Sequence, residues 1–329
     1  MKQIISIVNI FFLTIFFVNA QSIERQVIGS TGTTFSNANT TMEFTVGETA
    51  TTTVSNGNIT LYQGFQQGTI KLEIFMVPRV FLQGAALNPN TGEENLMRDD
   101  LREAGLLPTT SPYGDGVTCD ASLFNTTGTN AIVDWVLVEL RDKNDSASVL
   151  HSQSALLRRN GNIISANGQT ILTFEAAADD YFVAIQHRNH LGIMTATARF
   201  IDTSSVNFTN TSSQATFGSN AQTSSGMPSG IVAMWAGNAN EDTVVQYSGT
   251  TPDTPVILSE VLNDPGNFLN FPTFAVSGYN TNDINMDGIV QYSGTTPDTP
   301  FILQNVLAHP GNFLNFSTYQ ITEQLPSNE

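Results

Sequence analysis

The chain has 329 residues, of which 12 are basic and 29 acidic, giving a formal net charge of −17. No cationic surface is expected for binding phosphates, so nucleic acid is a poor candidate partner. Only 12% of the residues are charged, and the polarity comes instead from Thr, Asn, Ser and Gly, which favour strands and turns. The composition therefore predicts a mainly β fold. The excess of carboxylates suits divalent cations, calcium foremost.

Residues 1–20 predict a secretory signal peptide, with Lys2, an apolar stretch over 4–18 and a V-N-A end before Gln21. The apolar stretch is shorter than a bilayer-spanning helix needs, and no later segment comes closer, so we expect no membrane span. The mature chain is expected to be secreted or held on the outer cell surface, with the periplasm as the alternative. Cys119 is the only cysteine, so no internal disulfide is expected.

The chain divides into three further predicted parts. Residues 21–70 alternate polar and apolar side chains around two Asn-containing turns and predict an N-terminal β module of hairpins. Residues 71–229 predict a β-sandwich domain, Ig-like or transthyretin-like, because short strands follow one another without a long helical pattern. Residues 230–329 contain an internal repeat and predict a small duplicated domain.

Within the sandwich region, residues 132–140 form an apolar, β-branched run that predicts a central strand. In the run 193–201, Met194, Ala196, Ala198 and Phe200 alternate with polar residues, so we expect one face of this strand to lie in a core. A short helical turn is expected within 93–107. Other strands are expected at 154–158, 171–174 and 181–188.

The internal repeat is the clearest signal in the sequence. Residues 246–274 and 291–319 match at 22 of 29 positions with an offset of 45, as expected for a duplicated unit that packs against its neighbour. In each copy an apolar run follows a Thr-Pro pair, at Thr254 and Thr299, which predicts a short helix with Thr as its N-cap and Pro in its first turn.

Each copy opens with oxygen-bearing side chains at alternate positions. The second copy has the pattern D-x-N-x-D-G-x-V, and a loop around a hard cation needs side-chain oxygens at positions 1, 3 and 5, glycine at 6 and a carbonyl at 7. Position 12 is Gly294, so the loop is not a complete EF-hand, and a later acid has to close the shell. The predicted calcium ligands are Asp283, Asn285, Asp287, Ile289, Gln291 and Asp298 in the second copy, and Asn238, Asn240, Asp242, Val244, Gln246 and Asp253 in the first.

The first loop is expected to bind calcium more weakly than the second. Asn238 takes the place of an Asp, which removes one charge, and Thr243 takes the place of the turn glycine. The alternative for both loops is that their Asn and Asp side chains only stabilise Asx turns.

The segment from His187 to His190 is the only histidine cluster. A zinc enzyme would need a third ligand, so we expect a buried or turn-stabilising pair between two strands. Trp135 is expected in the sandwich core, and Trp235 in a core in preference to a ligand platform. The sequence contains no G-x-S-x-G elbow, phosphate loop or H-E-x-x-H. We therefore predict a protein that is not an enzyme, with a secreted glycoside-active or other hydrolase, its acids brought together by the fold, as the alternative.

Two resemblances narrow this prediction. The duplicated loop-plus-helix units resemble dockerin and EF-hand-like calcium modules of exported bacterial proteins. Other motifs are Q-V-I-G-S-T-G (26–32), V-F-L-Q-G (80–84), M-R-D-D-L-R (97–102), I-V-D-W-V-L-V-E-L-R (132–141), H-R-N-H-L-G (187–192) and M-W-A-G-N-A-N (234–240). These motifs resemble a family of secreted and surface proteins of Bacteroidetes, some of which carry a haemagglutinin label. The two resemblances together imply a calcium-binding protein that acts in adhesion, with a glycan or protein on a cell surface as its ligand.

Overall fold

The computed structural model describes residues 31–36, 41–46, 53–55, 60–62, 72–211 and 215–327. The chain forms two compact units, residues 1–70 and 71–329. In the first unit, strands β1 (Thr31–Ser36) and β2 (Thr41–Val46) pair antiparallel, as do β3 (Thr53–Ser55) and β4 (Thr60–Tyr62). The predicted signal peptide lies outside the described residues.

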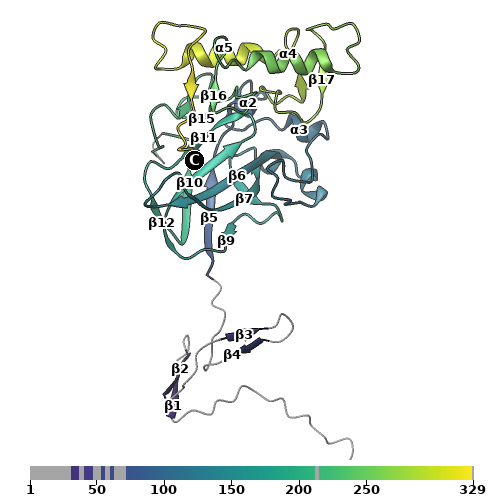
Figure 1. Ribbon diagram of the computed structural model, residues 1–329. Coiled ribbons are helices and arrows are strands. Elements are labelled where there is room, and N and C mark those ends of the chain that lie inside the picture. Colours follow the sequence, from purple (N-terminus) through teal and green to yellow (C-terminus); the bar gives the residue numbers. More distant parts are fainter. Residues whose placement is uncertain are drawn as a thin grey trace, which may run out of the picture. The chain divides into compact units, whose positions relative to one another are not determined.

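The two largest β-sheets of the second unit are arranged like a sandwich, so the predicted fold class is confirmed (Figure 1). The larger sheet has the order β11-β10-β6-β7-β8, and a sixth strand, β12, pairs with the start of β10. The smaller sheet has the order β13-β5-β9. Their bounds are β5 (Ile74–Arg79), β6 (Ile132–Asp142), β7 (Val149–Arg158), β8 (Ile163–Ser165), β9 (Leu172–Phe174), β10 (Asp179–His187), β11 (His190–Met194), β12 (Arg199–Ile201) and β13 (Thr203–Asn207).

Strand β6 is central, as its apolar sequence predicts. It pairs antiparallel with β10 on one side and β7 on the other. Trp135 on β6 is fully buried in the sandwich core with Leu156 of β7 and Met76 of β5, which confirms its predicted position. Burying such side chains contributes roughly 1.5 to 3 kcal/mol each.

The single strand predicted over 193–201 is wrong. β11 ends at Met194, and β12 begins only at Arg199. Between them the backbone N–H of Ala196 donates to Ala215, so the chain leaves the sheet although its polar and apolar residues still alternate. On β12, Ile201 is buried, and Phe200, expected on the core face, is 56% exposed.

Short elements connect the two sheets with the C-terminal part. The helical turn expected within 93–107 is helix α3 (Asp100–Glu103). The remaining short elements of this region are α2 (Gln83–Ala86), the 3-10 helices η1 (Ala121–Asn125) and η2 (Gly128–Asn130), and the paired strands β14 (Gln222–Thr223) and β15 (Ala233–Met234).

Residues 236–327, called here the repeat module, contain the two predicted helices. Helices α4 (Thr254–Asn263) and α5 (Thr299–Ala308) lie in one row in Figure 1. Each buries a pair of β-branched residues four positions apart, Ile257 with Val261 and Ile302 with Val306, as one face of a helix requires. Trp235 is 2% exposed in the same core, so its predicted core role is confirmed.

Two short strand pairs join the copies of the repeat crosswise. β16 (Val244–Val245) of the first cation loop pairs with β19 (Ile321–Thr322), which follows the second copy. β17 (Val276–Ser277), which follows the first copy, pairs with β18 (Ile289–Val290) of the second cation loop. Each copy is therefore completed by the other, as in an internal two-fold arrangement.

Among the described residues, the helices are all too short or too polar to cross a bilayer.

Candidate metal centre

The second loop, residues 283–291, folds around its own carboxylates. Asp283 uses both oxygens, since Oδ1 accepts from the N–H of Asp287 at 3.1 Å and Oδ2 from the N–H of Gly288 at 2.9 Å. These donors stand at loop positions 5 and 6, where a cation-binding loop turns sharply. Gly288 has φ of 84°, a left-handed conformation that glycine adopts without strain.

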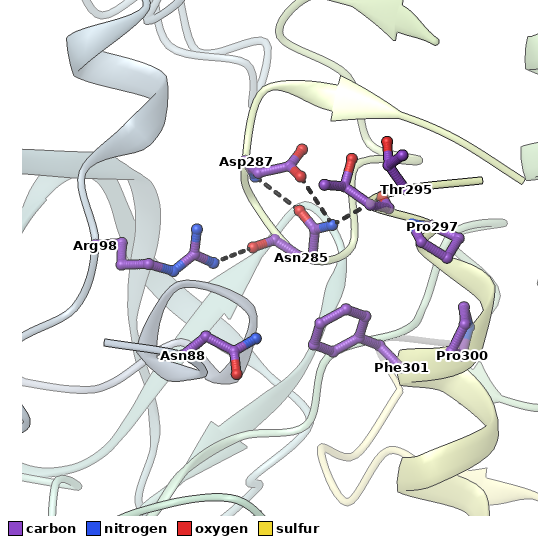
Figure 2. A pocket seen from close by; sticks show the side chains of 9 residues that line it. Asn88, Arg98, Asn285, Asp287, Thr295, Pro297, Pro300 and Phe301 are labelled. Carbon is purple, nitrogen blue, oxygen red and sulfur yellow. Dashed lines mark hydrogen bonds between the residues drawn. The ribbon is translucent and has the colours of Figure 1, made fainter. Parts of the chain in front are cut away.

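Asn285 and Asp287 lie on the same turn (Figure 2). Asn285 Oδ1 accepts from the N–H of Asp287 at 2.8 Å, and Asn285 Nδ2 donates to Asp287 Oδ2 at 3.2 Å. Asp287 Oδ1 accepts from the N–H of Ile289 at 2.9 Å. The side chains predicted for positions 1, 3 and 5 therefore gather in one loop.

Asp298 returns to this loop from the start of α5. Its Oδ1 accepts from the N–H groups of Ile284 and Asn285 at 2.7 and 3.2 Å, and its Oδ2 from Gln291 at 2.8 Å. The acid that the sequence singles out as the nearest one able to close the shell thus lies against loop positions 2, 3 and 9.

The prediction that Thr254 and Thr299 are the helix N-caps is wrong. Asp253 and Asp298 occupy the N-cap positions of α4 and α5, but neither side chain caps its helix, because their oxygens bind the loop amides. The Thr254 and Thr299 hydroxyls donate instead to the carbonyls of Tyr247 and Tyr292, at 3.0 and 2.9 Å.

Gln291 and Gln246, at position 9 of their loops, bridge the turns that lead to Asp298 and Asp253. Gln291 Oε1 accepts from the N–H of Thr296 at 3.0 Å, and its Nε2 donates to the carbonyl of Thr273 at 2.8 Å. Gln246 makes the equivalent bonds to Thr251 and Thr318. Each glutamine thereby ties its own copy to the end of the other copy.

The first loop repeats this geometry with weaker groups. Asn238 and Asn240 accept from the N–H of Asp242, and Asp242 accepts from that of Val244, each at 3.0 or 3.1 Å. Asp253 returns to the loop as Asp298 does and accepts from the N–H groups of Ala239, Asn240 and Gln246. Thr243 takes φ of 70° where the second loop has glycine.

Burial sets the electrostatics of both loops. Asp283, Asp298 and Asp253 are all 0% exposed. Burial raises the pKa of Asp283 to about 7, although the charge of Arg188 acts in the opposite direction. Burial, followed by the charge of Asp283, raises the pKa of Asp298 far above its ordinary value. Burial likewise raises the pKa of Asp253 to about 7.

A cation here would rely on mixed oxygen donors. In the described part of the chain, no three His, Cys, Asp or Glu side chains are grouped so that they alone could hold a metal. Asp283 and Asp287 on the second loop and Asp298 beside it are not grouped closely enough to hold a metal by themselves, so a cation here would also need oxygens such as the side-chain amide of Asn285. Calcium accepts such sets of carboxylate, amide and carbonyl oxygens, so the donor chemistry fits this ion.

The sandwich domain holds the second loop in place. Arg98 Nη2 donates to the carbonyl of Asn285 at 2.6 Å (Figure 2), and Asn189 Nδ2 donates to the carbonyl of Asp283 at 2.6 Å. A Cβ atom on Gly84 would collide with the carbonyl oxygen of Ile284, so α2 can approach the loop this closely only with glycine. A cavity of about 340 Å³ opens beside the loop between Arg98, Asp287 and Phe301.

The histidine pair belongs to a buried hydrogen-bond chain. His190 Nε2 accepts from the N–H of Gly84 at 3.1 Å, so its proton lies on Nδ1, which faces His187 Nδ1 at 3.0 Å. His187 Nε2 in turn donates to Asp134 Oδ2 at 3.1 Å. All four ring nitrogens are engaged and both side chains are buried, which confirms the predicted buried pair.

The centre of this chain, Asp134, was not singled out in the sequence. Its carboxylate also accepts from Arg188 Nε at 3.1 Å and from the Tyr279 hydroxyl at 2.7 Å. Burial acts to raise the pKa of Asp134, but the charge of Arg188 and the bond from His187 outweigh it and lower the pKa to about 2. Tyr279 belongs to the repeat module, so a tertiary contact far along the chain defines this network.

Comparisons with known proteins place the chain in no family. No family model and no curated protein matches it. A chain of a type II cohesin–X–dockerin complex from Acetivibrio cellulolyticus, in a C-terminal interface mutant, is similar at 14% identity over 70% of this chain and 94% of that chain, with a TM-score of 0.30. The N-terminal interface mutant of that complex gives 14% identity, 71% and 93% coverage, and a TM-score of 0.28. Likeness this low carries no weight for fold or function.

Proposed function

We propose that this chain is a non-catalytic, calcium-binding protein of the adhesion or ligand-binding class, exported to the cell surface or beyond. The observation that carries the calcium assignment is the pair Asp283 and Asp298. Both side chains are 0% exposed, Asp283 on the second loop and Asp298 against it, and neither forms an ion pair with Lys or Arg within the described residues. Buried carboxylates of this kind are ordinarily protonated, paired with a cationic side chain or bound to a metal.

The Asx-turn alternative accounts for only part of the loop. Bonds from Asn285 and Asp287 to the N–H two residues ahead are Asx-turn bonds. An Asx turn does not require burial of its side chain, whereas the side chains of Asp283 and Asp298 are fully buried. A divalent cation between them would offset the cost of that burial, and millimolar calcium outside the cell would suffice for a site of extracellular affinity.

Calcium bound here would stabilise the junction with the sandwich domain. Arg98 and Asn189 already bind carbonyl groups of the second loop, so fixing the loop fixes the surface on which they dock. All four ring nitrogens of His187 and His190 have hydrogen-bond partners inside the protein, which favours a structural role for this pair, although both residues also line a cavity of about 310 Å³. The ligand class remains a glycan or a protein on a cell surface.

Thermal unfolding with and without calcium tests the metal assignment. At millimolar calcium and a dissociation constant of about 10⁻⁴ M, occupancy contributes about 1.4 kcal/mol per site, so chelation should lower the melting temperature. Asp287→Ala should abolish most of this response, and Asp242→Ala less of it, because the first loop has Asn238 in place of an acid. Asp145→Ala, in an exposed turn, should leave the response intact. Melting curves that coincide with and without chelator would contradict the assignment.

Turnover assays separate the two functional classes. The full chain should bind a glycan or protein ligand on an array without releasing products from polysaccharide or peptide substrates. Product release that disappears when a single carboxylate is replaced would favour the hydrolase alternative.

A further inference from the structure

Two loops of the repeat module expose apolar side chains. They are residues 264–274, after α4, and 309–319, after α5, called here the apolar loops. Phe268 and Phe313 at their tips are 82% and 83% exposed. Among residues 72–327, the two loops supply six of the eleven large apolar side chains that are exposed. The other four in the loops are Leu269, Phe271, Leu314 and Phe316. Patches of this kind mark interaction surfaces.

In each apolar loop, a buried asparagine fixes the backbone conformation that leaves the apolar side chains exposed. Asn267 is 3% exposed, donates from Nδ2 to the carbonyls of Val261 and Phe271, and accepts from the N–H of Phe271 at 2.8 Å. Asn312 makes the same three bonds in the second loop. The tips are therefore held outward before any partner binds, which reduces the entropy cost of association.

The two apolar loops occupy equivalent positions. They extend from opposite ends of the row formed by α4 and α5 (Figure 1), and the crosswise strand pairs relate the two copies by an internal two-fold arrangement. Both tips read P-G-N-F-L-N-F. Such a surface is self-complementary if the α4–α5 row of a second copy lies antiparallel to that of the first. The first apolar loop of one copy then meets the second apolar loop of the other.

Charge selects among the candidate occupants. Residues 230–327 contain nine Asp and Glu and no Lys or Arg, and neither 265–273 nor 310–318 contains a charged residue. An anionic lipid surface would be repelled, and interfacial anchors usually pair apolar residues with basic ones. The acidic groups of two modules also repel each other, and salt screens this repulsion. A second copy nevertheless offers uncharged apolar tips that match the tips of the first and do not need basic residues.

We propose that the apolar loops join two copies of this chain in a two-fold dimer, in which the first loop of each copy packs against the second loop of the other. Both contacts form in one binding event, so the second contact gains from the high effective concentration that the first creates. This inference does not depend on calcium occupancy or on the proposed ligand class.

Sedimentation equilibrium of the full chain tests the dimer. Phe268→Ser and Phe313→Ser should each lower the association constant about tenfold or more, and the double variant should lower it on the order of 100-fold or more. Raising NaCl from about 0.1 M to about 1 M should strengthen the dimer, because the Debye length falls from about 10 Å to about 3 Å. A basic protein partner would show the opposite salt dependence.

The matched control is Leu150→Ser, which removes a 46% exposed apolar side chain from β7 outside the loops and should leave the association constant unchanged. At protein concentrations where the original chain is monomeric, the melting temperature of the double Phe variant should match that of the original chain, since both side chains are mostly in solvent in the monomer. A chain that is monomeric at every salt concentration, or a dimer that the double variant leaves intact, would overturn the proposal. So would Phe-dependent binding of a monomer to phosphatidylcholine vesicles, which would assign the loops to a lipid surface.

Discussion

The two cation loops have matching geometry but differ in the residue at position 6. Thr243 adopts φ of 70° in the first loop, where Gly288 adopts 84° in the second. A left-handed conformation costs an L-residue roughly 1 to 2 kcal/mol, and a β-branched residue pays at the upper end. We therefore expect Thr243→Gly to raise the free energy of unfolding by about 1 kcal/mol, after the extra entropy of glycine in the unfolded chain is subtracted. Urea unfolding measures the difference.

The reverse change provides the control for this position. Gly288→Thr should destabilise the protein, because it introduces the same strain and places a Cβ 2.8 Å from Leu106 Cδ1. A Thr243→Gly variant that unfolds at the same or a lower urea concentration than the original chain would show that the left-handed angle is not under strain.

Asp134 supplies a second prediction for a single residue. Asp134→Ala should destabilise the protein by about 3 to 5 kcal/mol, because it leaves Arg188 buried without its counter-charge. The folded-state pKa of about 2 lies below the ordinary value of 3.8, so the contribution of this carboxylate is complete above pH 3.8 and is lost as the pH falls through about 2. The stability difference between the original chain and Asp134→Ala should accordingly shrink in acid. Asp180→Ala, at an exposed position of β10, should show no comparable loss.

At the scale of elements, α2 and α5 are joined by a buried pair of amides. Gln83 Nε2 donates to Asn305 Oδ1 and Asn305 Nδ2 donates to Gln83 Oε1, both at 2.7 Å. Gln83→Ala would leave the Asn305 amide, which is 2% exposed, without one of its partners. The expected loss is about 1 to 3 kcal/mol in the free energy of unfolding, measured by urea denaturation.

A double-mutant cycle isolates this contact from the effect of truncation. Replacing both residues, Gln83→Leu with Asn305→Leu, should cost less than the sum of the two single changes, because neither side-chain amide is then left without the other. The bonds to the backbone of Ala236 are lost in both the single and the double variants, so they do not enter the coupling. Strictly additive single and double changes would show that the two amides do not interact.

The sequence predicts elements well where the pattern is local. The run 132–140 is apolar on both faces and becomes the central strand β6, and the repeated Thr-Pro pairs begin helices at the expected places. The prediction fails at 193–201, where alternation is present but the backbone of Ala196 bonds to Ala215. It also gives the wrong helix caps, because the competing loop amides that occupy Asp253 and Asp298 cannot be seen in the helix sequence itself.

The candidate site is only half visible in the sequence, and the reason lies at the scale of the whole molecule. The D-x-N-x-D-G pattern identifies the loop, but the groups that hold it come from elsewhere: Asn189 is 94 positions from Asp283, and Arg98 is 187 positions from Asn285. Periodicity reports which face of an element is apolar, and not which element lies against it. The exposure of the apolar loops could not be predicted for the same reason, because the sequence alone does not distinguish an exposed Phe from a buried one.

These long-range contacts predict how the second unit unfolds. The repeat module is bound to the sandwich domain through Arg98, Asn189, Gln83 and the bond from Tyr279 to Asp134. Losing the module would strip partners from several buried polar groups at once, and each unsatisfied group costs about 1 to 3 kcal/mol. Residues 72–327 should therefore unfold in a single transition, with equal calorimetric and van't Hoff enthalpies. Calcium should raise the melting temperature of this single transition, and Asp134→Ala should lower it without splitting the transition in two. Two separate transitions, with calcium shifting only one of them, would show that the module folds independently of the sandwich.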